Sequence, residues 1–336
     1  MKRMIAAGLL ALAACAQMPT PEPVADAAPA CTVSAADQAW IDRALAAWQL
    51  SPHEMTGIGD VAGFEAVFFD AVCTLTSADA FSSRRESDAV WRAQPHDGMV
   101  ALPDGDTMPA GITSFTSGTG EHTFFVMSTP SVWRGGGVEG GPLGLETLMV
   151  AVLLHEGSHV AQARTYGERI GALAERENLS DEFSDDTMQA VFENDPDFAA
   201  SIARETELFF AATAAPGPDA ARALAEQARQ MMKARAAKYF TGDDAYWTEA
   251  EDLWLTLEGS GQWAGYAWLV DPGGAAVGED VAMPGFGQRS RWWSQKEGLA
   301  LVLALDKLSP GGWKAHVYGD GTLTLLDLLD AVLAAG

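Results

Sequence analysis

Residues 145–162 read LETLMVAVLLHEGSHVAQ, and the local fold around the chemistry of this chain follows from them. An apolar run without Pro or Gly, 145–154, leads into the pentad His155-Glu-Gly-Ser-His159, and Gly167 offers a stop. This apolar density predicts a buried helix. On a helix, His155 and His159 lie about one turn apart and face the same side. A buried helix rarely carries two histidines and a glutamate, because their desolvation is costly unless a metal ion or other partners compensate.

The pentad matches the HExxH pattern, in which two histidines on one helix face share a Zn²⁺ ion. Glu156 then lies beside the metal, where it can take a proton from the attacking water and pass it to a leaving amine. A satisfied structural cluster is the alternative for the same three residues. The sequence predicts a zinc site with His155 and His159 as ligands and Glu156 as the general base.

The first fifteen residues predict where this site works. Lys2 and Arg3 precede an apolar run, 4–14, which ends at Cys15 and has the composition of a signal peptide. The run is too short to cross a bilayer as a mature helix. It resembles a bacterial lipobox, which implies cleavage before Cys15, a lipid anchor on that cysteine and, with Ala16 next to it, transfer to the periplasmic face of the outer membrane. An ordinary secretory signal is the alternative, and it would change the anchoring but not the compartment.

Composition divides the rest of the chain. Residues 15–30 are rich in Pro and Ala and predict a tether. About 305 residues remain to fold, enough for two lobes that share a cleft. We expect an N-terminal lobe with a small sheet over 31–143 and a helical lobe that carries the pentad over 144–336.

Charge and cysteine content bound the partners and the compartment. The chain has 46 acidic and 21 basic residues, a net charge of −25, which argues against nucleic acid and anionic lipid surfaces as partners. Cys31 and Cys73 could form a disulfide in an oxidising envelope, but spacing alone leaves this open.

Local patterns predict a capped helix and several strands in the first lobe. Ser34 is a suitable N-cap for a helix that ends near Ser51-Pro52. β-branched and aromatic residues predict strands over 64–76, 89–92, 98–102 and 122–129. The run 135–140 formally satisfies G-x-G-x-x-G, a dinucleotide fingerprint, but 130–134 interrupt the tight turn that this fingerprint requires. We therefore expect a mobile loop at the rim of a cleft.

The pentad and the lipobox together resemble zincin-type metallopeptidases, specifically the glutamate-liganded gluzincins, attached to a bacterial envelope as lipoproteins. The specific part of the resemblance covers 155–159 and the lipobox. It implies an α+β fold, with a small N-terminal sheet lobe over a mostly helical lobe and zinc in the cleft between them. In such peptidases the strand before the active helix commonly edges the cleft. We expect a peptide to pair with the unpaired backbone groups of 123–129, with a plain core strand as the alternative.

The same resemblance implies that the third zinc ligand is an acid on a later helix, since no histidine follows at the metzincin distance. Asp195-Pro196 predicts the start of a helix over 196–214, and Glu205 lies in the apolar stripe of that helix. Because a buried acid needs a cation, Glu205 is the predicted ligand, with Glu207 and Glu258 as alternatives. The 46 residues from His159 to Glu205 exceed the short gluzincin spacing, so 168–195 would be an inserted helical excursion.

The C-terminal half is predicted to be helical, with helices from Asp219 and Asp244 and over 292–308 and 323–333. Small residues between Glu258 and Trp268 permit a close backbone approach to a neighbouring element. Tyr266 could stabilise a tetrahedral oxyanion, a role that Tyr or His has in many zinc peptidases. The rival donors are Arg289, Arg291 and His316. The Asp185-Asp186 pair is expected to be a solvated face rather than a calcium site.

These predictions converge on zinc-dependent hydrolysis of peptide bonds in a peptide or protein substrate at the bacterial cell envelope. Two alternatives stay open. One is a catalytically degenerate lipoprotein whose helical lobe binds a partner. The other is a zinc hydrolase that acts on a non-peptide amide, such as a cell-wall linkage.

Overall fold

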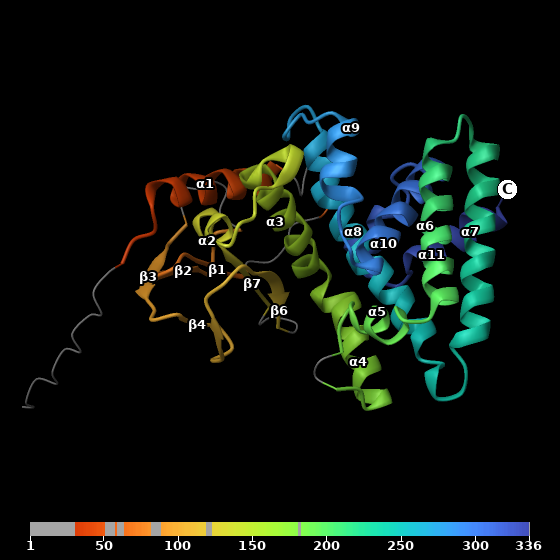
Figure 1. The fold of residues 1–336 in the computed structure, drawn as a ribbon, viewed down its shortest axis with the longest axis horizontal. Coiled ribbons are helices and arrows are strands. Elements are labelled where there is room, and N and C mark those ends of the chain that lie inside the picture. Colours follow the sequence, from red (N-terminus) through yellow and green to blue (C-terminus); the bar gives the residue numbers. More distant parts are fainter. Residues whose placement is uncertain are drawn as a thin grey trace, which may run out of the picture.

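A small sheet and a set of helices lie side by side, with helix α3 (Leu145–Gln162) between them (Figure 1). The structure is a computed structural model that describes residues 31–50, 58, 64–81, 89–118, 123–180 and 183–335. It shows the expected mixed α+β organisation, with the sheet in the N-terminal part and a mostly helical C-terminal part. The signal peptide, the tether and Cys15 lie outside the described residues. Among the helices described, none is both long and apolar enough to cross a membrane.

The first described element is helix α1 (Ala35–Leu50), which begins and ends where the sequence predicts. The Asp37 backbone N–H donates to Ser34 Oγ at 3.1 Å, so Ser34 caps the helix. Trp40 and Trp48 on its inner face are buried. A disulfide joins Cys31, just before the helix, to Cys73 with a Cα separation of 5.7 Å, which resolves the pairing that spacing left open.

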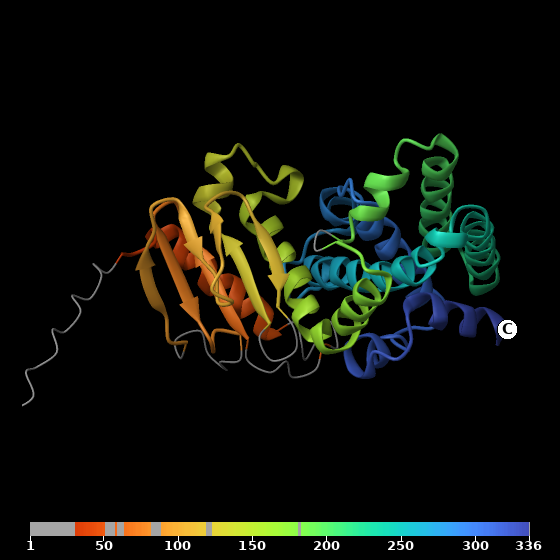
Figure 2. The ribbon, with the colours of Figure 1, turned by 90° about the horizontal axis from the view of Figure 1, so that it is seen from below.

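The sheet has five strands in the order β3-β2-β1-β7-β6 (Figure 2). β1 pairs in parallel with β7, and the other neighbours are antiparallel. A separate two-stranded hairpin of β4 and β5 covers the face of the sheet that carries Val67, Phe69 and Val126. The strand bounds are β1 Glu65–Phe69, β2 Cys73–Ser77, β3 Arg92–Pro95, β4 Met99–Ala101, β5 Thr107–Pro109, β6 Ser114–Ser117 and β7 Phe124–Ser128.

Two strand predictions are wrong for identifiable reasons. The single strand over 64–76 is a hairpin, because the Asp70 carboxylate accepts the backbone N–H groups of Val72 and Cys73, both at 2.8 Å, and closes a turn. The predicted substrate edge over 123–129 is β7, whose backbone is already paired on both sides. The edge strand of the described sheet next to α3 is β6, which the sequence analysis did not single out.

The helix that carries the pentad, α3, continues beyond Gly167, where the sequence predicted a stop. α3 runs through a π-helical turn, Ala163–Gly167, directly into α4 (Glu168–Glu177), so Gly167 does not end it. Before α3, the short helix α2 (Pro130–Gly135) separates strand β7 from the glycine-rich loop. Gly140 in this loop has φ 78°, and a Cβ there would lie 2.3 Å from the Gly144 backbone. The loop is therefore tightly packed onto the start of α3.

The helical part is organised around α8 (Trp247–Val270), which packs against α3 on one side and α10 on the other. α6 begins as predicted, with the Asp195 carboxylate accepting the N–H groups of Asp197 and Phe198. One hydrophobic core extends from α1 and the sheet through α3 to the last helix. The remaining helices are α5 Thr187–Phe192, α6 Pro196–Ala214, α7 Pro218–Tyr239, α9 Glu279–Ala282, α10 Trp293–Leu308 and α11 Leu325–Ala334.

Glycines set how closely α8 approaches its neighbours. A Cβ at Gly259 would lie 2.6 Å from the Gly298 backbone of α10. A Cβ at Gly265 would lie 2.6 Å from the Ala151 carbonyl oxygen of α3. Since real Cβ atoms do not approach backbone so closely, any side chain at either position would push the helices apart.

We expect Gly259→Ala to lower the free energy of unfolding by about 1–3 kcal/mol, because the added methyl group has no space between α8 and α10. Gly171→Ala is the matched control: this exposed glycine of α4 has open space at its Cβ. The control should stabilise the protein by about 0.5–1 kcal/mol through helix propensity. Denaturant unfolding of both variants measures the difference, and equal effects would show that the α8–α10 contact is not tight.

Candidate metal centre

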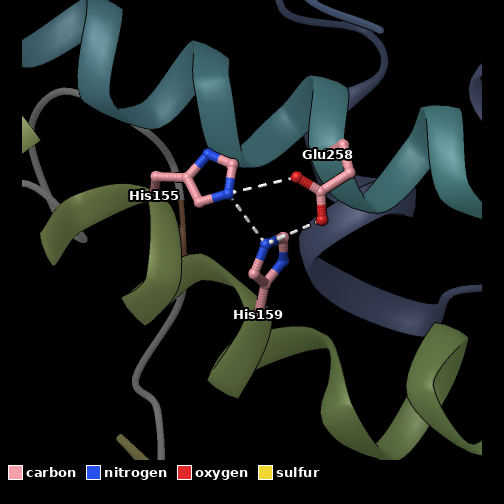
Figure 3. Close-up of side chains that lie close together, drawn as sticks. All are labelled: His155, His159 and Glu258. Carbon is pink, nitrogen blue, oxygen red and sulfur yellow. Dashed lines mark hydrogen bonds and ion pairs between the residues drawn. The ribbon is translucent and has the colours of Figure 1, made fainter. Parts of the chain in front are cut away.

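The two histidines of the pentad point to one place, as the helix spacing predicts. His155 Nε2 and His159 Nε2 lie 3.0 Å apart on the side of α3 that faces α8 (Figure 3). Their rings are nearly perpendicular, with an interplanar angle of 87°. His155 is buried and His159 is partly exposed.

Glu258 of α8 completes the group. Its Oε2 lies 3.3 Å from His155 Nε2, and its Oε1 lies 3.3 Å from His159 Nε2. In a tetrahedral site with bonds of 2.0–2.1 Å, neighbouring ligand atoms are about 3.3 Å apart. The three side chains therefore already have the spacing that one metal ion requires, and within the described residues they form the single group with this property.

Close helix packing is what brings these side chains together. A Cβ at Gly261, three residues after Glu258, would lie 2.9 Å from His155 Nδ1 and 3.1 Å from His159 Cε1. Gly157, within the pentad, faces the Trp48 ring of α1, where a Cβ would lie only 2.2 Å away. Glycines therefore let α1 and α8 approach α3 closely from two sides. A larger residue in place of Gly261 would fill space that the two imidazoles occupy.

Glu205, the predicted third ligand, belongs to a different group. It is fully buried, as its place in the apolar stripe predicts, but its cation is Arg235 of α7. Arg235 donates from Nε and Nη2 to the Glu205 carboxylate, with the shortest contact 2.7 Å, and Ser201 Oγ donates to Oε1 at 2.6 Å. A carboxylate satisfied in this way has no reason to bind a metal ion. The prediction of Glu205 as ligand is therefore wrong, and Glu258, one of the alternatives, has its place.

Burial and mutual attraction shape the charges of the centre. Burial alone would lower the pKa of His159, but the Glu258 carboxylate beside it outweighs burial and raises the pKa to about 9. Burial would raise the pKa of Glu258, and the two histidines reverse this and hold it below its usual range. Without a metal ion, a proton on His159 balances the negative charge of Glu258.

The chemistry of the donor atoms fits a metal ion. Glu258 Oε2 is buried and unpartnered among the described residues apart from the 3.3 Å contact with His155 Nε2, whereas the unpartnered Nδ1 atoms of His155 and His159 are not the ring atoms that face Glu258. Unpartnered buried polar atoms cost free energy, and a bound cation would compensate Glu258 directly. Two imidazoles and one carboxylate are a common ligand set for a catalytic ion that keeps a position open.

Glu156, the predicted general base, lines a cavity together with His155. This cavity has a volume of about 430 Å³ and lies between the sheet and the helical part. Burial raises the pKa of Glu156, while the charges of His155 and His159 and the Thr116 backbone N–H of β6 oppose this. Thr116 Oγ1 also donates to the Glu156 carbonyl at 2.7 Å, so β6 is tied to the active turn of α3.

The predicted oxyanion donor is not at this cleft. Tyr266 is buried two turns after Glu258 on α8, and burial raises its pKa to about 12. It is not among the described residues that line the cavity, so the structure does not bring it to the cleft, and its role as oxyanion donor stays a prediction. Among the three rivals, Arg291 stacks over Trp292, a cavity residue, at 4.2 Å from the ring centroid. Arg289 lies against Gly141, and His316 is near Asp320.

Asp185 is a residue that the sequence analysis missed. The Asp185-Asp186 pair was expected to be a solvated face, yet Asp185 is half-buried and accepts from Ser294 Oγ at 3.2 Å. Burial and the nearby Glu258 charge raise its pKa to about 8. A helix start so rich in acid gives no local signal that one of its carboxyl groups lies near a metal centre.

Comparison of the chain with protein-family models, curated proteins and solved structures found no match. What the centre does is therefore inferred from its own residues.

Substitution of the ligands should separate the two buried acids. We expect His155→Ala and Glu258→Gln to lower zinc affinity by at least about 100-fold, since each removes one of three ligands. Glu205→Gln should keep zinc and lose about 1–3 kcal/mol of unfolding free energy, because Arg235 loses one charged partner and keeps Glu251 at 2.8 Å. Glu207→Gln, an exposed acid on the same helix, should change neither. Zinc content after dialysis and denaturant unfolding measure both effects; zinc loss from a folded Glu205→Gln protein would contradict the assignment.

Metal binding should release a proton. Since the pKa of His159 in the metal-free protein is about 9, its ring is protonated at neutral pH and must lose the proton to become a ligand. Apparent zinc affinity should thus rise about tenfold per pH unit from pH 7 and level off near pH 9. Calorimetric titration at pH 7.5 in buffers of different ionisation enthalpy counts the protons, and a count of zero would disprove this charge state.

Proposed function

We propose that the chain is a zinc-dependent hydrolase of peptide bonds, of the glutamate-liganded zincin type. The observation that carries the proposal is the set of three ligand atoms 3.0–3.3 Å apart beside a cleft that also reaches Glu156. Two nitrogens and one carboxylate oxygen favour Zn²⁺ over Mg²⁺ or Ca²⁺, which prefer oxygen ligands throughout. His155, His159 and Glu258 would hold the ion.

Bound zinc would polarise the scissile carbonyl and make water acidic enough to react near neutral pH. Glu156 would take the proton of the attacking water on its carboxylate and deliver it to the leaving nitrogen. Burial raises the pKa of Glu156 above its ordinary value, a direction that favours a carboxylate as proton acceptor. The hydrogen bond from Thr116 Oγ1 to the Glu156 carbonyl keeps this turn of α3 in place.

Edge strand β6 supports a peptide as the substrate. It has one neighbour, β7, within the described sheet, and its Ser114 lines the cleft. An extended peptide can add to such an edge through backbone hydrogen bonds, whatever its sequence. β6 therefore takes the role that the sequence analysis assigned to 123–129.

The envelope location is part of the same proposal. A lipid anchor at Cys15 would hold the enzyme on the periplasmic face, most simply of the outer membrane, with 15–30 as the tether. The Cys31–Cys73 disulfide supports an oxidising compartment, because such bonds are rare in reducing ones.

Removal of the base should abolish hydrolysis and leave the metal in place. We expect Glu156→Gln to lower kcat by about 10²–10⁴-fold at unchanged zinc content, because the amide cannot accept the proton. Glu146→Gln, on the first turn of the same helix, is the matched control and should keep full activity. The assay follows cleavage of a mixed peptide library and of cell-wall fragments by mass spectrometry, with and without a chelator.

Chelator-sensitive cleavage of peptides supports the proposal. Cleavage of wall fragments alone would replace it with the non-peptide amidase. Zinc binding without hydrolysis of either pool would favour a degenerate binding protein.

A further inference from the structure

The wall of the cleft opposite β6 carries a chain of side-chain hydrogen bonds between α8 and α10. Gln262 Nε2 donates to Gln295 Oε1 at 3.0 Å, and Ser290 Oγ donates to the same oxygen at 2.7 Å. Ser290 Oγ in turn accepts the Trp292 backbone N–H at 3.1 Å. Gln295 Oε1 thus receives two donors, and the amide nitrogen of Gln262 is committed to it.

This arrangement leaves the amide oxygen of Gln262 without a partner. Gln262 is 5% exposed, and its Oε1 is buried with no hydrogen bond among the described residues. An unsatisfied buried acceptor costs about 1–3 kcal/mol, so such a group calls for a partner, which a bound ligand can supply. Gln262 lies one turn after Glu258 and lines the same cavity as His155 and Glu156. The free acceptor is therefore placed beside the reacting groups.

The rest of the lining is apolar or uncharged. Aromatic side chains come from three separate elements, α2, the turn 283–287 and the segment before α10: Trp133, Phe286 and Trp292. Ile112 and Val152 add aliphatic surface, and Glu156 is the one lining residue, among those described, that carries a carboxylate. Between the three aromatic groups a charged substrate side chain would lose its hydration, and Glu156 is the one charged partner it could reach among the described lining residues, whereas an aromatic or aliphatic side chain would be well packed.

We propose that Gln262 is a substrate-positioning residue, whose amide oxygen accepts a backbone N–H from a peptide that places an apolar side chain between Trp133, Phe286 and Trp292. The peptide nature of the ligand rests on the proposed function. Gln295 and Ser290 hold the Gln262 amide in the orientation that presents its oxygen to the cleft.

The test is a double-mutant cycle on binding rather than on turnover. The protein is the zinc-loaded chain with Glu156→Gln, so that ligands are bound and not cleaved. The ligands are blocked alanine pentapeptides with Phe, Asp or Lys at the centre, and versions of the Phe peptide in which each backbone nitrogen in turn is methylated. Isothermal titration calorimetry gives Kd for the protein with Gln262 and with Gln262→Met, which keeps the volume and removes the acceptor.

We expect the Phe peptide to bind at least about tenfold more tightly than the Asp or Lys peptides. Methylation of one particular nitrogen should weaken binding about 5- to 10-fold when Gln262 is present and have no effect in Gln262→Met. Gln38→Met replaces a glutamine whose side chain donates to Asp42 of its own helix, α1, and should retain the full methylation effect. If Gln262→Met fails to fold, Gln295→Met, which frees the Gln262 amide to turn, should reduce the same coupling.

Each outcome decides one claim. Equal methylation effects with and without Gln262, or no binding of any peptide, would overturn the role of Gln262. If peptides are cleaved but methylation weakens binding equally with Gln262 and with Gln262→Met, this inference is wrong and the proposed function stands. A methylation effect that depends on Gln262, together with no chelator-sensitive cleavage by the protein that retains Glu156, would contradict the proposed function. The cleft would then be a peptide-binding site without hydrolysis.

Discussion

The close contact between α3 and α8 is the constraint on which the centre depends. Two histidines on one turn can face each other on any helix, but the third ligand must come from a neighbour that approaches within reach of both imidazoles. Gly261 and Gly265 allow this approach, since a Cβ at either would collide with a histidine ring or with the α3 backbone. Gly259 and Gly298 then let α10 close in from the other side of α8. Conformational entropy lost by placing glycines in a helix is offset by the packing of three helices around one small polar group.

The surroundings of two buried glutamates determine whether each forms a structural ion pair or a candidate metal ligand. Glu205 shares Arg235 with Glu251, at 2.7 and 2.8 Å, and burial with neighbouring carboxylates holds the pKa of Glu297 beside them well above its ordinary value. The guanidinium of that cluster neutralises part of its acidic charge, and Glu251 and Glu297 adjoin a small cavity of about 20 Å³. Glu258 faces two imidazoles, and the nearer wall of the cavity includes one of them, His155. The same residue type is therefore a structural ion pair in one place and a ligand in the other.

Much of this could be predicted from the sequence where the signal is local. The helix over 145–162, the caps Ser34 and Asp195 and the mixed α+β organisation follow from periodicity and capping chemistry. The third ligand could not be settled in this way, because helix phase shows that an acid is buried but not which cation it meets. For Glu205 that cation is Arg235, thirty residues later on another helix. The small residues after Glu258 were the available signal for a close approach. Strand β6 was missed because its sequence, SFTS, lacks the apolar density of a core strand.

Several unpartnered polar atoms of the described residues belong to the centre and to the cleft beside it. Glu258 Oε2 lies at the centre, and Ser114, Trp133 and Gln262, which line the adjoining cleft, each carry one such atom, while others, such as those of Arg235 and Glu297, lie elsewhere in the helical part. Each such atom lowers stability in the metal-free, ligand-free state, and the continuous core from α1 to α11 must offset that cost. A ligand that bonds to these atoms removes this cost when it binds. Part of the binding free energy of zinc and of a peptide therefore comes from satisfying groups that the folded protein leaves unpartnered. Polar groups left unsatisfied beside two imidazoles are thus better understood as a preformed site than as errors of packing.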